Sequence, residues 1–424
     1  GAVTCNHPNH VWAGAGAKQP PLEQFNAVRV HTRERGPFYS VRLPAQPLTR
    51  VDKVADVPFT LKDDFRDNYP LGLLAVPLDD VVRLHMSSGT TGKPVVTGYT
   101  RDDLEIWGEC MERVLRMGEV SEHDVIQNAY GYGLFTGGLG FHIGAERIGC
   151  TVVPTSSGVT ARQVMLMQDL GTTVLTCTPS YALVLAEALK AEAVRQRLKL
   201  RVGFFGAEPW TEGMRRQIES GLGLEAFDVY GLTELGGPGV AVECREHDGL
   251  HVFEDHFLAE TVDTESGRPV PSGVEGELVL TSLTRRASPI VRYRTRDRVI
   301  LVDEPCACGS PFRRISKLRG RTDDMLVVRG VDVFPSRVAE ILLTIGALTG
   351  HRPAWAHERG LRADLGELAS WVDEAEALWM GFLSLPDDAE RRVLLDAGTY
   401  ETDAAIVTGQ ALHHGSLHRL PPAL

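Results

Sequence analysis

A short loop of small residues constrains this chain most. Residues 87 to 94 read Ser-Ser-Gly-Thr-Thr-Gly-Lys-Pro, between strand-like runs at 81 to 86 and 95 to 97. Glycines permit positive φ, so backbone N–H groups can converge on an anion, while hydroxyls and a lysine add donors and charge. The loop therefore predicts a phosphate cradle, although it lacks the Walker A spacing; a flexible polar turn is the alternative. The candidate phosphate ligands are Ser87, Ser88, Gly89, Thr90, Thr91, Gly92 and Lys93.

Composition limits the class of protein. With 424 residues and 43% apolar content, the chain can bury a large core and form at least two domains. A net charge of −12 argues against nucleic acid or an acidic membrane as a partner. Neither a run of about 18 apolar residues nor a signal-like N-terminus is evident. Seven cysteines in so long a chain do not suggest a disulfide framework, so we expect a reducing, cytoplasmic setting.

The pattern of apolar residues predicts an α/β fold. Residues 101 to 117 form an amphipathic helical pattern, and helix-like and strand-like runs alternate from 124 to 230, which favours parallel strands. A further helix is expected to begin near Phe59, with Thr60 as its N-cap and Asp63 at the capping-box position. Residues 251 to 303 look β-rich. We therefore expect a large N-terminal domain of several subdomains, with parallel-sheet layers and a β-rich part.

An aromatic, glycine-rich turn follows the strand-like run at 124 to 129. Glycines clear space there, and Tyr132 and Phe135 supply flat apolar walls. Such a composition suits a pocket for a planar ligand. A packing turn, in which glycines let two elements approach closely, is the alternative.

Two later strand-like runs end in polar turns. Gly206-Ala207-Glu208-Pro209 follows one, and Gly231-Leu232-Thr233-Glu234 follows the other. Loops at the carboxyl ends of parallel strands are where open α/β sheets bind ligands. Thr233 is a candidate to bond a phosphate oxygen and Glu234 to hold Mg²⁺, whereas an ordinary helix start is the alternative. Asp297, in a charged segment, is a candidate for two ribose hydroxyls; a solvated charged edge strand is its alternative.

Four residues have the chemistry of a structural zinc site. Cys306 and Cys308 form a C-x-C knuckle, and Cys244 and His251 lie upstream. Four nitrogen and sulfur ligands would close a tetrahedral site and tie the β-rich segment together. His247 and His256 are rival ligands, but His247 lies in a charged turn, so His251 is preferred. Unrelated buried or free cysteines are the alternative.

Several motifs occur in the order found in one family. They are SSGTTGKP, NAYGYGLFTGG, GAEPW, VYGLTE, RYRTRD and GRTDDMLVVRGVDVFP. Through them the chain resembles adenylate-forming acyl-CoA ligases, specifically phenylacetate–CoA ligases and related aryl-CoA ligases, over roughly residues 35 to 343. The resemblance implies two half-reactions: ATP and an aromatic acid give acyl-AMP, and coenzyme A then displaces AMP. Some members carry zinc on cysteines and a histidine in the corresponding region, and a homodimer would fit the family.

The resemblance also implies residue roles. Residues 87 to 93 hold the pyrophosphate end of ATP, Thr233 the α-phosphate, Glu234 the Mg²⁺ and Asp297 the ribose. The adenine is surrounded by Gly206, Ala207, Glu208, Pro209, Asp228, Val229, Tyr230 and Gly231, with Tyr230 as a stacking candidate. The aryl acid pocket is lined by Tyr132, Phe135, Thr136, Gly137 and Gly138. Arg321 and Asp323 belong to a hinge motif. The candidate acids are phenylacetate, a hydroxybenzoate and an aminobenzoate.

The C-terminal part departs from the family. Members usually carry a lysine there that serves adenylation, but this chain has no lysine after Lys317, and the resemblance fades after about residue 343. Arg329, Arg359 and Arg362 are candidates to replace it. We expect an N-terminal domain at 1 to 318, with a loose arm at 1 to 24, and a small mobile α+β C-terminal domain at 319 to 424. Delivery of the acyl group to a carrier protein, or nucleotide binding without catalysis, are the alternative functions.

Overall fold

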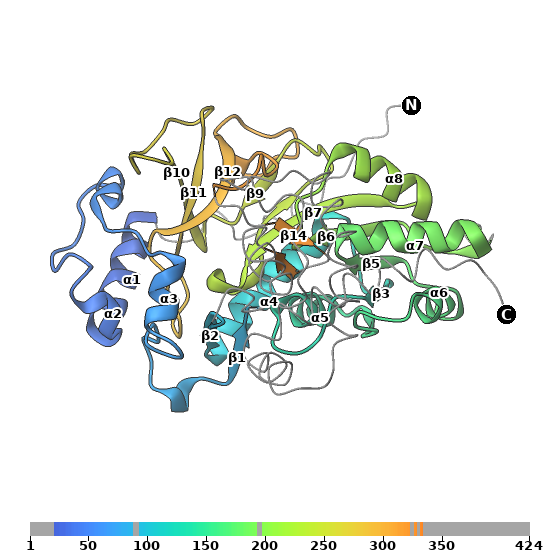
Figure 1. Ribbon diagram of the computed structural model, residues 1–424, viewed down its shortest axis with the longest axis horizontal. Helices are drawn as coiled ribbons and strands as arrows, with labels where there is room; N and C mark the ends of the chain where they lie inside the picture. Colours follow the sequence, from blue (N-terminus) through green and yellow to red (C-terminus); the bar gives the residue numbers. More distant parts are fainter. Residues whose placement is uncertain (1–20, 88–92, 193–196, 323–325, 329–330, 334–424) are drawn as a thin grey trace, which may run out of the picture. The chain divides into compact units, whose positions relative to one another are not determined.

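The computed structural model describes residues 21–87, 93–192, 197–322, 326–328 and 331–333 (Figure 1). Contacts divide the chain into two units, residues 1–87 with 95–322 and residues 88–94 with 323–424. In the second unit, β14 (Leu326–Val328) pairs antiparallel with β15 (Val331–Val333). The predicted domain boundary at residue 318 and the predicted character of the C-terminal domain stay predictions. Helix α1 (Pro21–Arg35) begins inside the segment expected to be a loose arm.

The first unit is organised around an eleven-stranded sheet, in the order β10-β11-β12-β13-β9-β8-β7-β6-β5-β3-β4. Its parallel half confirms the predicted α/β core. The strands are β3 (Val125–Asn128), β4 (Thr151–Val153), β5 (Val174–Cys177), β6 (Val202–Gly206) and β7 (Glu225–Leu232). The helices between them are α5 (Thr136–Ile148), α6 (Thr160–Asp169), α7 (Pro179–Glu192) and α8 (Glu212–Leu222).

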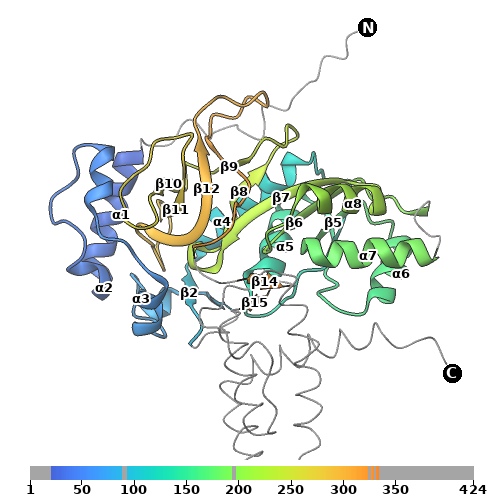
Figure 2. The same ribbon diagram turned by 45° about the horizontal axis from the view of Figure 1, so that its top comes forward.

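Helices cover both faces of the parallel half. α4 (Arg101–Met117) and α5 pack on the face that carries Phe204, whereas α6, α7 and α8 pack on the face that carries Phe205. The two phenylalanines are neighbours in β6 and point to opposite faces, because successive strand residues alternate. Figure 2 shows α6, α7 and α8 together along β5 and β6, as does Figure 1. Each fully buried phenylalanine contributes about 1.5–3 kcal/mol by leaving water.

Helix α4 has the bounds that its sequence pattern predicts. Thr100 caps it: the Asp103 N–H donates to the Thr100 hydroxyl, and the Asp103 carboxylate accepts from the Thr100 N–H. The expected cap of α3 (Lys62–Asp67) was wrong by one residue. Leu61 is the N-cap, and its N–H donates to Asp64 at 2.7 Å. The Thr60 hydroxyl instead donates to the carbonyl of Val291, since residue 60 pairs with the sheet.

The antiparallel half continues the sheet beyond β7. Its strands are β8 (Gly237–Glu243), β9 (Leu250–Val252), β10 (Phe257–Val262), β11 (Glu275–Ser282), β12 (Tyr293–Val302) and β13 (Arg314–Ile315). The start of β12 pairs with β11 on one side and bridges Thr60 and Arg321 on the other, so the alternative reading of residues 292–297 as an edge strand was wrong. Tyr293, Thr295 and Asp297 are all buried, at alternate positions of β12.

Two smaller parts complete the first unit. α1 and α2 (Pro37–Ser40) pack with residues of the β10–β11 region, and short 3-10 helices lie at Val51–Asp56 and Leu78–Asp80. β1 (Arg83–Met86) and β2 (Val96–Tyr99) form an antiparallel hairpin, as their strand-like sequences predict. The predicted phosphate loop therefore joins the two strands of this hairpin. Among the described residues, no helix has the length and apolar character needed to cross a membrane.

Candidate active site

A cavity of about 50 Å³ lies at the carboxyl edge of the parallel strands. Its lining comes from three separate segments: Tyr130, Phe135, Thr136, Gly137 and Phe141; Gly206 and Ala207; and Val229, Gly231, Thr233 and Pro238. The first segment holds residues predicted to bind the acid, and the other two hold residues predicted to bind the nucleotide. One cavity thus brings both predicted sets together.

Two aromatic side chains form a flat wall of this cavity. The rings of Tyr130 and Phe141 stack, with centroids 5.3 Å apart and planes 2° from parallel. The Tyr130 hydroxyl donates to the carbonyl of Gly206 at 3.2 Å, and burial raises the pKa of Tyr130 well above its usual value. Sequence reasoning missed both residues as site residues. The available signal was that Tyr130 follows the carboxyl end of β3, where ligand sites form.

Tyr132 and Gly138, predicted for the acid, are not among the residues that line this cavity. The Tyr132 hydroxyl accepts from the Asn128 amide at 2.7 Å and bonds Nδ1 of His142 at 3.0 Å. Gly138 allows a close approach, because a Cβ there would lie 2.5 Å from the carbonyl oxygen of Gly131. Contact of these two residues with the acid stays a prediction.

The turn after β6 is tightly built. A Cβ on Gly206 would lie 2.1 Å from the carbonyl oxygen of Val229, so only glycine fits. Ala207 has a φ of 67°, in the left-handed region that costs a non-glycine residue energy. The Glu208 carboxylate accepts from the N–H and hydroxyl of Ser180, at the start of α7. That side chain therefore stabilises the helix start, and Pro209 ends the turn.

Two sets of hydrogen bonds hold the polar candidate residues in and after β7. Thr233 and Glu234 begin the 3-10 turn Thr233–Leu235, and the hydroxyl of Tyr293 donates to Glu234 at 3.2 Å. Asp297 accepts from the Tyr230 hydroxyl at 2.7 Å and from the Arg321 guanidinium at 2.6 Å. The structure thus brings together Tyr230, Asp297 and Arg321, which lie far apart in the sequence.

Asp228 belongs to a buried group of charges. Burial, followed by the negative charge of Glu243, raises the pKa of Asp228 to about 7. The Asp228 N–H donates to Glu243 at 2.9 Å, and the Lys317 ammonium lies 3.4 Å from the other carboxylate oxygen of Glu243. Burial would raise the pKa of Glu243, but the hydrogen bond from His247 and the charge of Arg215 lower it, so near neutral pH the proton resides on Asp228.

Much of the phosphate loop lies outside the described residues. Residues 88 to 92 and Asp323 fall there, as do Arg329, Arg359 and Arg362. Lys93 is exposed and groups with the second unit. The base of the loop is fixed within the first unit, since the Val95 N–H donates to the Ser87 hydroxyl at 2.9 Å and the Ser87 N–H donates to the Val95 carbonyl at 3.0 Å.

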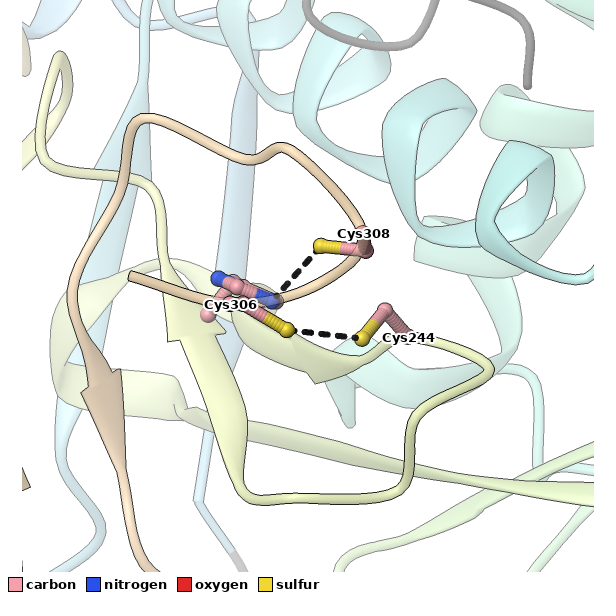
Figure 3. A group of neighbouring side chains, drawn as sticks. Cys244, Cys306 and Cys308 are labelled. Carbon is pink, nitrogen blue, oxygen red and sulfur yellow. Dashed lines mark hydrogen bonds between the residues drawn. The ribbon is translucent and has the colours of Figure 1, made fainter. Parts of the chain in front are cut away.

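The four predicted zinc ligands converge, and we call Cys244, His251, Cys306 and Cys308 the cysteine–histidine cluster. Their ligand atoms all lie within 4.8 Å of one another. Figure 3 shows the three cysteines turned toward one another, with the sulfurs of Cys244 and Cys306 3.7 Å apart. Nε2 of His251 lies 3.3 Å from the sulfur of Cys308, while its Nδ1 donates to the carbonyl of Phe312 at 3.0 Å. That bond leaves the Nε2 lone pair facing the sulfurs, as a metal ligand requires.

The rival histidines have other partners. Glu225 and then Glu243 raise the pKa of His247 to about 9, so this side chain is a cation at neutral pH. His256 bonds the hydroxyl of Thr284 through Nδ1 at 3.0 Å. The geometry therefore supports the choice of His251.

Comparison with known proteins agrees with this arrangement. The family model of AMP-binding enzymes matches residues 43–284. The chain is 47% identical to the phenylacetate-coenzyme A ligase of Thermus thermophilus over 83% of this chain and 80% of that protein. It is 46% identical to the phenylacetate-coenzyme A ligase of Escherichia coli, over 78% and 77%.

A solved structure shares the fold. It is 2-hydroxyisobutyryl-CoA ligase in complex with 2-HIB-AMP and CoA, which is 26% identical with a TM-score of 0.73, covering 84% of this chain and 82% of that one. The sheet and the helices around it thus have the architecture of adenylate-forming ligases. This chain belongs to the AMP-binding enzymes, and within them to the phenylacetate–CoA ligases.

Proposed function

We propose that this chain is an AMP-forming acid–thiol ligase that converts an aromatic carboxylic acid, with phenylacetate as the first candidate, into its CoA thioester. The observation that carries the proposal is the single cavity that unites the aromatic wall of Tyr130, Phe135 and Phe141 with Thr233 at the end of β7. A ring bound against that wall would have its carboxylate near the predicted α-phosphate site. The sequence identity to phenylacetate–CoA ligases supports the same reaction.

The reaction has two balanced steps. A carboxylate oxygen attacks the α-phosphorus of ATP, and the bond to pyrophosphate breaks to give acyl-AMP. The sulfur of coenzyme A then attacks the acyl carbon; its proton is lost and AMP leaves. Positioning and charge stabilisation dominate such chemistry. We assign the α-phosphate to Thr233, the pyrophosphate to residues 87 to 93 with Lys93, and the ribose to Asp297.

Asp297 can accept bonds from ribose hydroxyls while it keeps its present partners. One of its oxygens accepts from Tyr230 and the other from Arg321, and each carboxylate oxygen can accept more than one hydrogen bond. Tyr230, hydrogen-bonded to the same carboxylate, is our candidate for the adenine-stacking residue.

The lining favours an unsubstituted aromatic ring over a hydroxy- or aminobenzoate. None of the described lining residues carries a charged side chain, and the Tyr130 hydroxyl already donates to Gly206. Apart from the hydroxyls of Thr136 and Thr233, the lining side chains offer a polar ring substituent little to bond, and a substituent left unpaired costs about 1–3 kcal/mol. Phenylacetate avoids this loss.

Two metals complete the proposal. Glu234, buried and bonded by Tyr293, is the candidate ligand for Mg²⁺, which would neutralise phosphate charge. The cysteine–histidine cluster fits Zn²⁺, because three sulfurs and one imidazole nitrogen converge at distances that a tetrahedral ion can bridge. Such a site would tie β9 and the segment before β13 together. A reducing cytoplasm would keep its cysteines reduced, so that they can bind the ion as thiolates.

The test is pyrophosphate release with ATP and Mg²⁺ across phenylacetate, hydroxybenzoates and aminobenzoates, with and without coenzyme A. We expect release that depends on phenylacetate, and a CoA thioester by mass spectrometry. Acid-dependent pyrophosphate without any thioester would instead favour delivery to a carrier protein. Nucleotide binding with no release for any acid would contradict the proposal and favour a non-catalytic role.

A further inference from the structure

His85 has no role in the reaction described so far, yet it is buried beside the site. It lies in β1, two residues before Ser87, with 1% of its surface exposed. Its ring meets Tyr99 and Trp107 edge-on, with centroids 5.3 and 5.7 Å away. A phenylalanine would suit such packing and would carry no polar atom. The nitrogen atoms of His85 therefore call for an explanation.

One nitrogen makes a bond that links two segments of the site. Nδ1 of His85 donates to the carbonyl of Leu134 at 2.9 Å, and the Met86 N–H donates to the same oxygen at 2.9 Å. The side chain of Leu134 is 60% exposed, so this residue is held by its backbone rather than by packing. The next residue, Phe135, lines the cavity. The carbonyl of Leu134 thus links β1 to the segment that forms the cavity wall.

The other nitrogen has no such bond. Nε2 of His85 is buried and lacks a hydrogen-bond partner among the described residues. Burial lowers the pKa of His85, and the guanidinium groups of Arg83 and Arg285 lower it further, against the carbonyl of Leu134, which raises it. The ring is therefore neutral near pH 7, with its proton on Nδ1, because a carbonyl can only accept. An unpaired buried nitrogen costs about 1–3 kcal/mol, which a phenyl ring would not incur.

The same hairpin is held on its other strand. The Arg285 guanidinium donates to the Thr97 hydroxyl and to the Gly98 carbonyl, and the Tyr99 hydroxyl donates to the carbonyl of Gly236. Gly236 directly follows the turn that carries Thr233 and Glu234. The β1–β2 hairpin is thus bonded to the acid wall through His85 and to the predicted phosphate turn through Tyr99.

We propose that His85 is a positioning residue that couples the two substrates: filling the cavity with the aryl acid fixes Leu134 and β1, and thereby strengthens ATP binding. The inference rests on the proposed function. Only the donor at Nδ1 matters for it, since that atom alone reaches the carbonyl of Leu134. Coupling between two binding sites of one protein commonly amounts to a factor of about 5–150 in affinity.

The experiment measures the dissociation constant of an ATP analogue with a methylene bridge between the α- and β-phosphorus. It is titrated by calorimetry into the full chain with Mg²⁺, with and without saturating phenylacetate. We expect phenylacetate to tighten binding about tenfold in the wild type. In His85→Phe the gain should fall below about twofold, while His85→Asn, whose amide nitrogen replaces Nδ1, should keep most of it.

Two further variants sharpen the test. His85→Gln places the same amide one carbon farther out, so it should lose the coupling even if the phenylalanine variant fails to fold. His142→Phe removes a histidine that bonds Tyr132 rather than Leu134, and should keep the coupling. If both His85→Gln and His85→Phe keep full coupling, while the wild type turns over phenylacetate, the role of His85 is overturned and the proposed function stands. A wild type that binds the analogue, but shows neither coupling nor pyrophosphate release with any aryl acid, would overturn the proposed function as well.

Discussion

The cavity at the ends of β3, β6 and β7 is lined by uncharged side chains and backbone, whereas the cysteine–histidine cluster gathers four ligand atoms between β8, β9 and the loop before β13. The cavity uses an edge of the parallel half, where turns leave room for a substrate. The cluster instead ties together short antiparallel strands, since β9 and β13 have only three and two residues. The cavity therefore leaves space for a ligand, whereas the cluster has the arrangement of a structural site that holds strands together.

Removing a ligand of the cluster should therefore reduce stability far more than chemistry. For Cys308→Ser we expect loss of bound zinc, and a loss of about 4 kcal/mol of unfolding free energy, which is the size typical of a lost metal. Metal content by mass spectrometry and thermal unfolding check this. Cys150→Ser is the control, because that buried thiol is not one of the four cluster residues and donates to the carbonyl of Ser121. Equal zinc and equal melting temperature in both variants would refute the structural zinc site.

Removing the charge of Glu234, next to the cavity residue Thr233, should reduce activity far more than stability. Glu234→Gln keeps the shape of the side chain but weakens the proposed hold on Mg²⁺, so kcat should fall by about 10²–10³. The melting temperature should change little, because the bond from Tyr293 can be kept. Glu246→Gln, at an exposed position, should leave kcat unchanged. Wild-type kcat in Glu234→Gln, at the Mg²⁺ concentration that saturates the wild type, would contradict the assignment of Glu234 to Mg²⁺.

The buried carboxyl of Asp228, beside Glu243, should make the free energy of unfolding depend on pH. The folded-state pKa of Asp228 is about 7 against a usual 3.8, so the folded protein holds this proton more tightly than the unfolded chain between those values. Stability from this group is thus greatest below pH 4 and falls as pH rises to about 7. Asp228→Asn should be more stable than the wild type at pH 8, on the order of 2 kcal/mol, and the difference should vanish toward pH 4. Thermal unfolding from pH 4 to pH 8 measures it.

Asp263→Asn serves as the matched control for that experiment. Hydrogen bonds from Ser266 lower the pKa of Asp263, so the sign is reversed. The variant should gain nothing at pH 8. A wild type and an Asp228→Asn variant that keep a constant difference across the pH range would contradict the raised pKa of Asp228.

The smallest expected effect separates two neighbouring tyrosines. Tyr130→Phe removes the bond to the carbonyl of Gly206 in the cavity, and should raise KM for the acid about threefold to tenfold. Tyr132→Phe should change KM by less than about twofold, because its hydroxyl bonds Asn128 and His142 instead. Steady-state kinetics with phenylacetate decide the matter. A larger rise in KM for Tyr132→Phe would support the role that the sequence predicts for it.

The sequence predicted a helix or strand well where the signals that define it lie within a few residues of one another. The helix at 101 to 117 has a capping box and an apolar stripe, and both ends were found. The predicted N-cap at Thr60 was wrong because the Thr60 hydroxyl donates to the carbonyl of Val291, which is far along the chain. Position 297 was open to an edge-strand reading for a similar reason, since its partners, β11 on one side and Arg321 on the other, are remote in the sequence.

The sequence by itself determined the order of the motifs, the α/β class, and the candidates for the cysteine–histidine cluster, with His251 preferred over His247 and His256. Those follow from residue type and spacing, which need no knowledge of the fold. Tertiary structure alone decided that Tyr130 and Phe141 form the wall, that Arg321 holds Asp297, and that His85 reaches Leu134. Each depends on a distance between segments remote in the chain, and such distances are set by strand pairing and packing rather than by any local pattern.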